Sequence, residues 1–175
     1  TISMTNKYFD GVVTNAGVAE DPDSELIAIA KEVKAKVAEK MEGLHIADAM
    51  TELFVLFKRC NKYIDETMPW VLAKDEAKKD RLATVLYNLT ECICIGAELL
   101  FPFLPETSDR ILAQLNTSHR SYEELDQYGL YPSGNKVTDK PEPLFARLDA
   151  NEIAKKVEEM HPAVAAPEEE KEDVI

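Results

Sequence analysis

The sequence predicts an all-α protein: a helical bundle followed by a disordered, acidic C-terminal linker. Glycine contributes only six of the 175 residues. Alternation of apolar and polar residues is rare, whereas apolar residues recur at steps of three and four over long stretches, as in amphipathic helices. Hydrophobic residues make up 45% of the chain and charged residues 30%, which is enough apolar material for one core. The length suits a single domain with a tail.

Two helices are predicted before residue 43. Residues 1–9 have the apolar spacing of a helix in its last turns, and the turn signal at residues 10–11 ends it. The second helix is expected to begin after Asp21, a residue type that caps helix N-termini, with Pro22 at the first helical position. It is expected to end near Met41, before a glycine that suits a helix C-terminus.

The third predicted helix begins near His45 and carries a strong amphipathic pattern. Its apolar face is expected to pack in the core: Ile46, Ala49, Met50, Leu53, Phe54, Phe57, Cys60 and Ile64. Lys58, Arg59 and Lys62 form a short basic patch near its C-terminal end. Two readings of this patch stay open: a solvated helix face, or a surface that steers phosphate groups.

The stretch Asn61-Lys-Tyr-Ile-Asp-Glu-Thr-Met-Pro-Trp70 is expected to form a corner between the third helix and the next, and it contains the only tryptophan. Pro69 lacks an N–H group and should push Met68 towards an extended backbone, which ends the helix. The ring of Trp70 then points either into the core or into solvent. That choice decides whether Trp70 could contact a ligand.

The second half of the chain predicts shorter elements after one long helix. A helix is expected over residues 75–101, with Gly96 permitting a close approach of another helix. A further helix is expected over residues 106–115. Residues 121–128 are expected to form a short helix, because they open with the Ser-x-x-Glu capping pattern.

The C-terminal part is predicted to contain a loop, a short anchor and a last helix. Residues 129–143 have the composition of a loop, and residues 144–160 read as an apolar anchor followed by a last helix. One domain is therefore predicted over residues 1–160, with residues 1–10 as the end of the helix that enters it. Residues 161–175, rich in Pro, Ala and Glu, are expected to form a flexible acidic linker.

No residue pattern predicts catalysis or a metal site. The sequence has no glycine-rich phosphate loop, no nucleophile elbow and no His-Glu-x-x-His motif. Cys60, Cys92 and Cys94 are expected to be reduced and buried, as in a cytosolic protein. No apolar run approaches the ~20 residues of a membrane span. The net charge of −13 disfavours broad phosphate binding, so any contact with nucleic acid would be local.

Several segments resemble the anticodon-binding domain of methionyl-tRNA synthetase, and the resemblance covers about residues 1–160. The matching segments are Asn6-Lys-Tyr-Phe-Asp-Gly11, the stretch Asn61–Trp70 with the following Val-Leu-Ala-Lys74, Leu99-Leu-x-Pro-Phe-Leu-Pro105, Ile111-x-x-Gln-Leu115 and Pro143-Leu-Phe-x-Arg-Leu-Asp149. The related synthetases for isoleucine, valine, leucine and cysteine share the helical bundle but match these segments less closely.

The resemblance implies a domain that recognises the CAU anticodon of tRNA(Met). In the family, a tryptophan at the position of Trp70 stacks on an anticodon base, and the adjoining proline, here Pro69, shapes the pocket. Asn61 is the third candidate residue for RNA binding. The favoured reading of its amide, however, is that it orients the corner by hydrogen bonding to backbone. No catalytic residue and no metal ligand are expected in this chain.

The resemblance also implies a longer parent enzyme, a cytoplasmic class I methionine–tRNA ligase that uses ATP and Mg²⁺. Its catalytic domain would precede Thr1, as would an asparagine and an arginine that complete the anticodon site. A domain after Ile175 that forms a homodimer is an open possibility, and no membrane partner is expected. Two alternatives stay open: a non-enzymatic helical module that binds a protein, and the anticodon domain of a related class I synthetase.

Overall fold

The computed structural model describes residues 1–145 and 149–160. The chain divides into two units, Thr1–Leu144 and Phe145–Ile175, which are described separately. The expected linker over residues 161–175 and most of the expected anchor over residues 144–148 lie outside the described residues. The single domain over residues 1–160 therefore stays a prediction.

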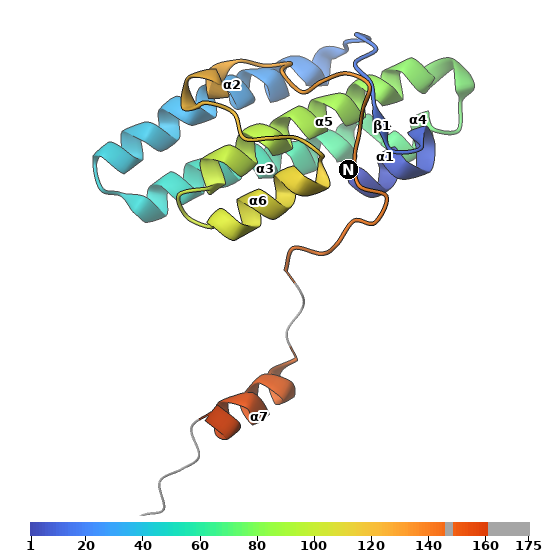
Figure 1. The fold of residues 1–175 in the computed structure, drawn as a ribbon. Helices are drawn as coiled ribbons and strands as arrows, with labels where there is room; N and C mark the ends of the chain where they lie inside the picture. The colour runs from blue at the N-terminus through green and yellow to red at the C-terminus, as the bar shows by residue number, and fades with distance from the viewer. Residues whose placement is uncertain (146–148, 161–175) are drawn as a thin grey trace, which may run out of the picture. The chain divides into compact units, whose positions relative to one another are not determined.

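The first unit is a helical bundle, which confirms the predicted fold class (Figure 1). Its helices are α1 (Ile2–Phe9), α2 (Asp21–Glu42), α3 (Ile46–Thr67), α4 (Pro69–Leu72), α5 (Lys79–Leu100) and α6 (Pro105–Gln114), with two 3₁₀ helices, η1 (Glu76–Lys78) and η2 (Tyr122–Asp126). In the second unit, α7 covers Ala150–Met160, close to the predicted last helix.

Helix α5 is the central element of the bundle and packs against α2, α3 and α6 (Figure 1). Almost every side chain from Arg81 to Leu100 is buried. The segment Glu76–Leu100 is long and apolar enough to cross a membrane, but 94% of its most apolar window is buried inside the protein. The core of the bundle therefore accounts for the apolar character of this helix.

The predicted close approach at Gly96 is confirmed. A Cβ atom added at Gly96 would lie 2.5 Å from Cε1 of Phe57 on α3. This distance is shorter than any ordinary carbon–carbon contact, so the glycine lets the ring of Phe57 rest directly on the backbone of α5.

A small β ladder is the main feature of the first unit that was not predicted. Strand β1 (Val12–Val13) pairs antiparallel with β2 (Asn135–Lys136). The predicted loop over residues 129–143 therefore returns to the N-terminal part of the chain, where the side-chain amide of Asn6 donates to the carbonyl of Thr138 at 2.9 Å. Two-residue strands carry no alternation, so periodicity could not reveal them.

The predicted cap of α2 is wrong by one residue. The N-cap is Glu20, the helix begins at Asp21, and Pro22 occupies the second position. The reason is a contact made by Asp23, whose carboxylate accepts the N–H of Glu20 at 3.1 Å. Asp23 thereby satisfies one of the free N–H groups at the start of the helix.

Candidate nucleic-acid interface

Met68 forms the bend between α3 and α4 in a left-handed conformation, with φ 43° and ψ 66°. The prediction of an extended Met68 is therefore wrong. Its N–H donates to the carbonyl of Ile64 at 2.9 Å, so Met68 still completes the last turn of α3. Pro69 excludes the right-handed helical conformation of the residue before it. The chain turns through the left-handed region instead, at a cost of about 1–2 kcal/mol.

Helix α4 is a single turn that presents Trp70 to solvent. Pro69 is buried at its first position, where the missing N–H group costs nothing. Trp70 is 45% exposed, and the neighbouring Met68 and Val71 are 45% and 42% exposed. Leu72 packs against the core from the same turn. The corner therefore offers a patch of apolar side chains outward while its inner side is anchored.

Asn61 lies on α3, about 9 Å along the helix axis before Thr67. It is exposed. Among the described residues, its side chain makes no hydrogen bond to the corner, so the prediction that Asn61 orients the corner through backbone contacts is wrong. Trp70 is thus the exposed residue of the turn that the buried Pro69 begins, and Asn61 is a separate polar group on the preceding helix.

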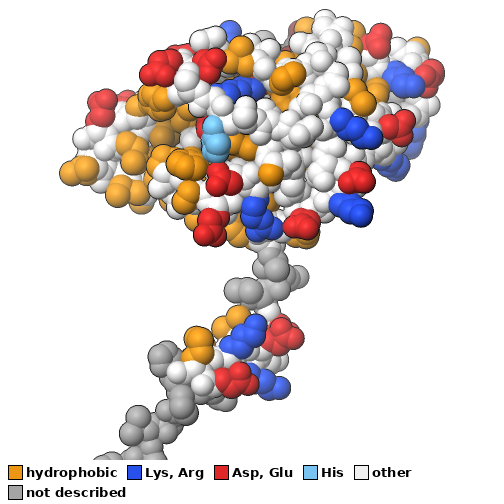
Figure 2. Space-filling view, in the orientation of Figure 1, with side chains coloured by type: hydrophobic (Ala, Val, Ile, Leu, Met, Phe, Trp, Pro, Cys, Tyr) orange, Lys and Arg blue, Asp and Glu red, His pale blue; other side chains and the backbone are white. Residues whose placement is uncertain are grey.

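The predicted basic patch is smaller in the structure than in the sequence. Arg59 is buried, with ion pairs to Glu25 at 3.1 Å and Glu66 at 2.9 Å. Lys58 and Lys62 remain exposed, and Lys62 also pairs with Glu66 at 3.4 Å. On the face shown in Figure 2, basic and acidic side chains are interspersed over the first unit. Positive charge near the corner therefore comes from single lysines.

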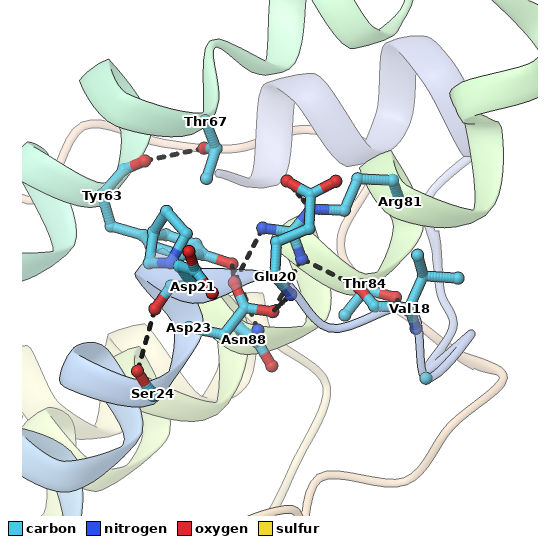
Figure 3. Close-up of polar contacts among 12 residues, drawn as sticks. Val18, Glu20, Asp21, Asp23, Ser24, Tyr63, Thr67, Arg81, Thr84 and Asn88 are labelled. Carbon is cyan, nitrogen blue, oxygen red and sulfur yellow. Dashed lines mark hydrogen bonds and ion pairs between the residues drawn. The ribbon is translucent and has the colours of Figure 1, made fainter.

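A buried polar network joins three helices behind the corner (Figure 3). Arg81 on α5 donates two hydrogen bonds to the carboxylate of Asp23 on α2, both at 2.7 Å. The hydroxyl of Tyr63 on α3 donates to the same carboxylate at 2.6 Å and accepts from the amide of Asn88 at 3.2 Å. Burial raises the pKa of Asp23, but the hydrogen bonds from Arg81 and Tyr63 outweigh it and hold this pKa below its usual value.

Sequence reasoning assigned no role to this network, although one signal pointed to it. A helix that is apolar on all sides is buried on all sides, and a charged residue within it needs a partner. Arg81 and Glu91 are charged residues of α5 that are buried in this way. Glu91 is fully buried and pairs with Arg120 at 2.7 and 2.8 Å. The partners come from distant parts of the chain, so their identity could not be inferred from spacing.

The cysteine prediction is confirmed within the described residues: Cys60, Cys92 and Cys94 are buried and free. In the same part of the chain, no group of three or more His, Cys, Asp or Glu side chains is placed to hold a metal ion. The chemistry available at the corner is therefore an aromatic surface with nearby amide and ammonium groups.

Helix α1 borders the corner. A cleft of about 180 Å³ is lined by the last turn of α1, including Lys7 and Phe9, by Leu72 and Ala73, and by the start of α5. Figure 1 shows α1 beside α4. A group bound on the corner would therefore lie near α1 as well as α4.

The sequence profile described as the anticodon-binding domain of methionyl tRNA ligase matches residues 13–163. The chain belongs to this family. Methionine–tRNA ligase of Clostridium perfringens (strain 13 / Type A) is 43% identical over 170 residues, which cover 97% of the chain and 26% of that protein. The Bacillus subtilis (strain 168) ligase is 39% identical over 176 residues, which cover 99% of the chain and 26% of that protein.

Solved structures agree with this family. Free methionyl-tRNA synthetase of Mycobacterium tuberculosis superposes with a TM-score of 0.77 at 30% identity, over 85% of this chain and 30% of that one. The predicted resemblance and the predicted helical bundle of a methionyl-type anticodon-binding domain are thus confirmed. The chain spans about a quarter of the length of its curated relatives.

Proposed function

We propose that this anticodon-binding domain recognises the CAU anticodon of tRNA(Met), with Trp70 stacking on one anticodon base. The observation that carries the proposal is the exposure of Trp70, a residue that is 45% exposed on a one-turn helix. Stacking of a base on an aromatic side chain contributes about 1–3 kcal/mol. Proteins read RNA sequence mainly from unstacked loop bases, and a fixed, exposed ring suits such a base.

The surroundings of the ring favour a small, local RNA contact. Pro69 holds the turn that carries Trp70, and the exposed amide of Asn61 can donate to and accept from a base edge or a ribose. Lys58, Lys62 and Lys74 are exposed near the corner and can approach phosphate groups. Because the whole chain carries a net charge of −13, these contacts would guide the anticodon loop without binding RNA broadly.

The parent of this domain is proposed to be a cytoplasmic methionine–tRNA ligase. Its relatives bear that name and are about four times as long as the matched region, and one solved relative is bound by methionyl-adenylate. Catalysis, with ATP and Mg²⁺, is assigned to a region before Thr1, and so are the residues that complete the anticodon site. A homodimer formed through a region after Ile175 remains part of the proposal.

The test follows the fluorescence of Trp70 while the chain is titrated with anticodon stem-loops that carry CAU or GAU. A second chain, extended upstream of Thr1 by one helix, is titrated in parallel. We expect saturable quenching by CAU and not by GAU, at least in the extended chain. With labelled RNA, Trp70→Ala should retain its helical circular dichroism and bind CAU about 5- to 150-fold more weakly.

The control replaces an exposed aromatic residue far from the corner in sequence. Tyr122 on η2 is 53% exposed, and Tyr122→Ala should leave the affinity for CAU unchanged. Equal responses to CAU and GAU in both chains, or full binding by Trp70→Ala, would contradict the proposal. The exposed apolar surface of Met68, Trp70 and Val71 would then fit a protein partner.

A further inference from the structure

The helices on both sides of the turn at Met68 and α4 are attached to one carboxylate. Tyr63 lies on α3 before this turn, Arg81 lies on α5 after it, and both donate to Asp23 on α2 (Figure 3). All three side chains are at least 95% buried, with exposures of 0%, 4% and 3% for Tyr63, Arg81 and Asp23. Residues 64–80 therefore form a segment whose two flanks meet at Asp23.

Further bonds secure these flanks. The hydroxyl of Thr67, the last residue of α3, donates to the carbonyl of Tyr63 at 2.7 Å. Arg81 also donates to the carbonyl of Val18 at 2.9 Å and pairs with Glu20 at 3.2 Å. The bond of Thr67 closes the last turn of α3, whereas the bonds of Arg81 fix the start of α5 against the segment that leads into α2.

The corner is anchored on its inner side by Pro69 and Leu72, but its backbone conformation is not stable by itself. Helix α4 contains four residues, and a helix of one turn is not stable by itself in water. Met68, which precedes it, adopts a left-handed conformation that is unfavourable for a side chain other than glycine. Such a turn persists only where its surroundings determine it: Pro69 and Leu72 anchor its inner side, and Asp23 is the group that both flanks share.

We propose that Asp23 is the positioning residue of the anticodon site, acting through Tyr63 and Arg81 to set the orientation in which Trp70 meets a base. Asp23 does not touch the RNA in this scheme. The part of the inference that concerns RNA rests on the proposed function, whereas the part that concerns the orientation of Trp70 is a property of the free chain.

A second buried site provides matched controls. The hydroxyl of Tyr131 donates to the carbonyl of Leu115 at 2.7 Å and accepts from the amide of Asn135 at 3.0 Å. The hydroxyl of Tyr63 likewise donates once and accepts once, and both tyrosines are buried, at 1% and 0% exposure. Replacing either residue by phenylalanine removes the same kind of hydroxyl, but only Tyr63 is bonded to Asp23.

The experiment compares Tyr63→Phe with Tyr131→Phe at a temperature where both are folded. The readouts are quenching of Trp70 by acrylamide in the free chain and the affinity for a labelled CAU stem-loop. Tyr63→Phe should change the quenching constant and weaken CAU binding about two- to tenfold, the effect of one lost hydrogen bond. Tyr131→Phe loses a hydrogen bond to a neutral carbonyl, so it should lower the melting temperature less than Tyr63→Phe does, and it should change neither readout.

A stronger pair is Asp23→Asn against Glu91→Gln, since each removes the charge of a buried carboxylate paired with arginine. Asp23→Asn should change the quenching constant and the CAU affinity more than Tyr63→Phe does. Glu91→Gln should change neither. If Asp23→Asn does not fold, the tyrosine pair decides the question.

The inference would be overturned if Tyr63→Phe and Asp23→Asn both fold and keep the quenching constant and the CAU affinity of the unmodified chain. Failure of the proposed function looks different: neither the unmodified chain nor the extended chain distinguishes CAU from GAU. In that case the acrylamide measurement on the free chain still decides whether Asp23 sets the orientation of Trp70.

Discussion

At the scale of single residues, His119 lies between two carboxylates. Its Nδ1 is 2.9 Å from Glu98, its Nε2 is 2.9 Å from Asp109, and the edge of its ring meets Phe101. Hydrogen bonds to Glu98 and then to Asp109 favour the doubly protonated ring and raise the pKa of His119 above its ordinary value. When it is protonated, the imidazole thus links the end of α5, helix α6 and the segment after it.

This arrangement predicts a pH-dependent contribution to stability. Because the pKa of His119 is raised in the folded chain, its contribution is complete below the unfolded pKa of about 6.5 and is lost as pH rises through the folded pKa. The imidazole is 47% exposed, so solvent screening limits the effect to about 1 kcal/mol or less. Urea unfolding of the unmodified chain and of His119→Gln at about pH 5.5 and pH 8.5 measures it.

The unmodified chain should be more stable than His119→Gln at the lower pH and nearly equal to it at the higher pH. A difference in the free energy of unfolding that stays the same at both values would show that His119 contributes only through packing. The same experiment on Asp109→Asn should give a smaller change in the same direction, because Glu98 still faces the ring.

The contacts of a residue could be predicted where its side chain interacts with residues close to it in sequence, and not elsewhere. The capping contact of Ser121 with Glu124, three residues away, was predicted and is present at 3.0 Å. The pair of Asp23 with Arg81 was not predicted, because the two residues meet only after α2 and α5 have packed. The exposure of Trp70 also depends on packing, so the sequence left both orientations open.

At the scale of elements, the contact between α3 and α5 depends on Gly96. Gly96→Ala places a methyl group 2.5 Å and 2.7 Å from Cε1 and Cζ of Phe57. Helix propensity favours alanine by about 1 kcal/mol, whereas overpacking a core costs about 1–3 kcal/mol. We expect a net loss of stability of about 1 kcal/mol, measured as a lower urea midpoint with an unchanged slope.

Gly43→Ala is the control for this prediction. Gly43 follows α2 with φ −79°, and an added Cβ atom would come no closer than 3.5 Å to its neighbours. That variant should be as stable as the unmodified chain or slightly more stable. If Gly96→Ala behaved in the same way, the ring of Phe57 could move aside at little cost and the contact would be less tight than the structure indicates.

The long helices could be predicted from the sequence because each repeats its apolar pattern over several turns. The expected ends of α2 and α3 lie within a few residues of the observed ones, and α5 begins within a short 3₁₀ turn of its expected start. Helix α4 and the left-handed Met68 were missed, since one turn contains no periodicity. Their geometry is set by Pro69 together with contacts from other helices.

At the scale of the whole molecule, charge predicts how RNA binding responds to salt. The chain has 33 acidic and 20 basic residues, and exposed lysines near the corner are few. Each phosphate contact with a single strand contributes about −0.7 to the slope of log affinity against log salt. Contacts by Lys58, Lys62 and Lys74 would give a slope of about −2, measured by titrating a labelled CAU stem-loop at several salt concentrations.

Lys58→Ala should make this slope shallower by about 0.7 and should weaken CAU and GAU equally, because a phosphate contact carries no sequence information. A slope of about −6 or steeper would contradict the local interface and would require a broad basic surface. Lys34→Ala, which removes a lysine paired with Asp126, is expected to leave the slope unchanged.

The small β ladder has a consequence for the order of folding. It pairs Val12 with Lys136, so it closes nearly the whole bundle into a loop, and closure entropy grows with the length enclosed. The hairpin of α2 and α3 needs only neighbouring segments and can form early. During synthesis on the ribosome, strand β1 emerges long before β2. Strand β1 must therefore remain unpaired until almost all of the bundle has left the exit tunnel.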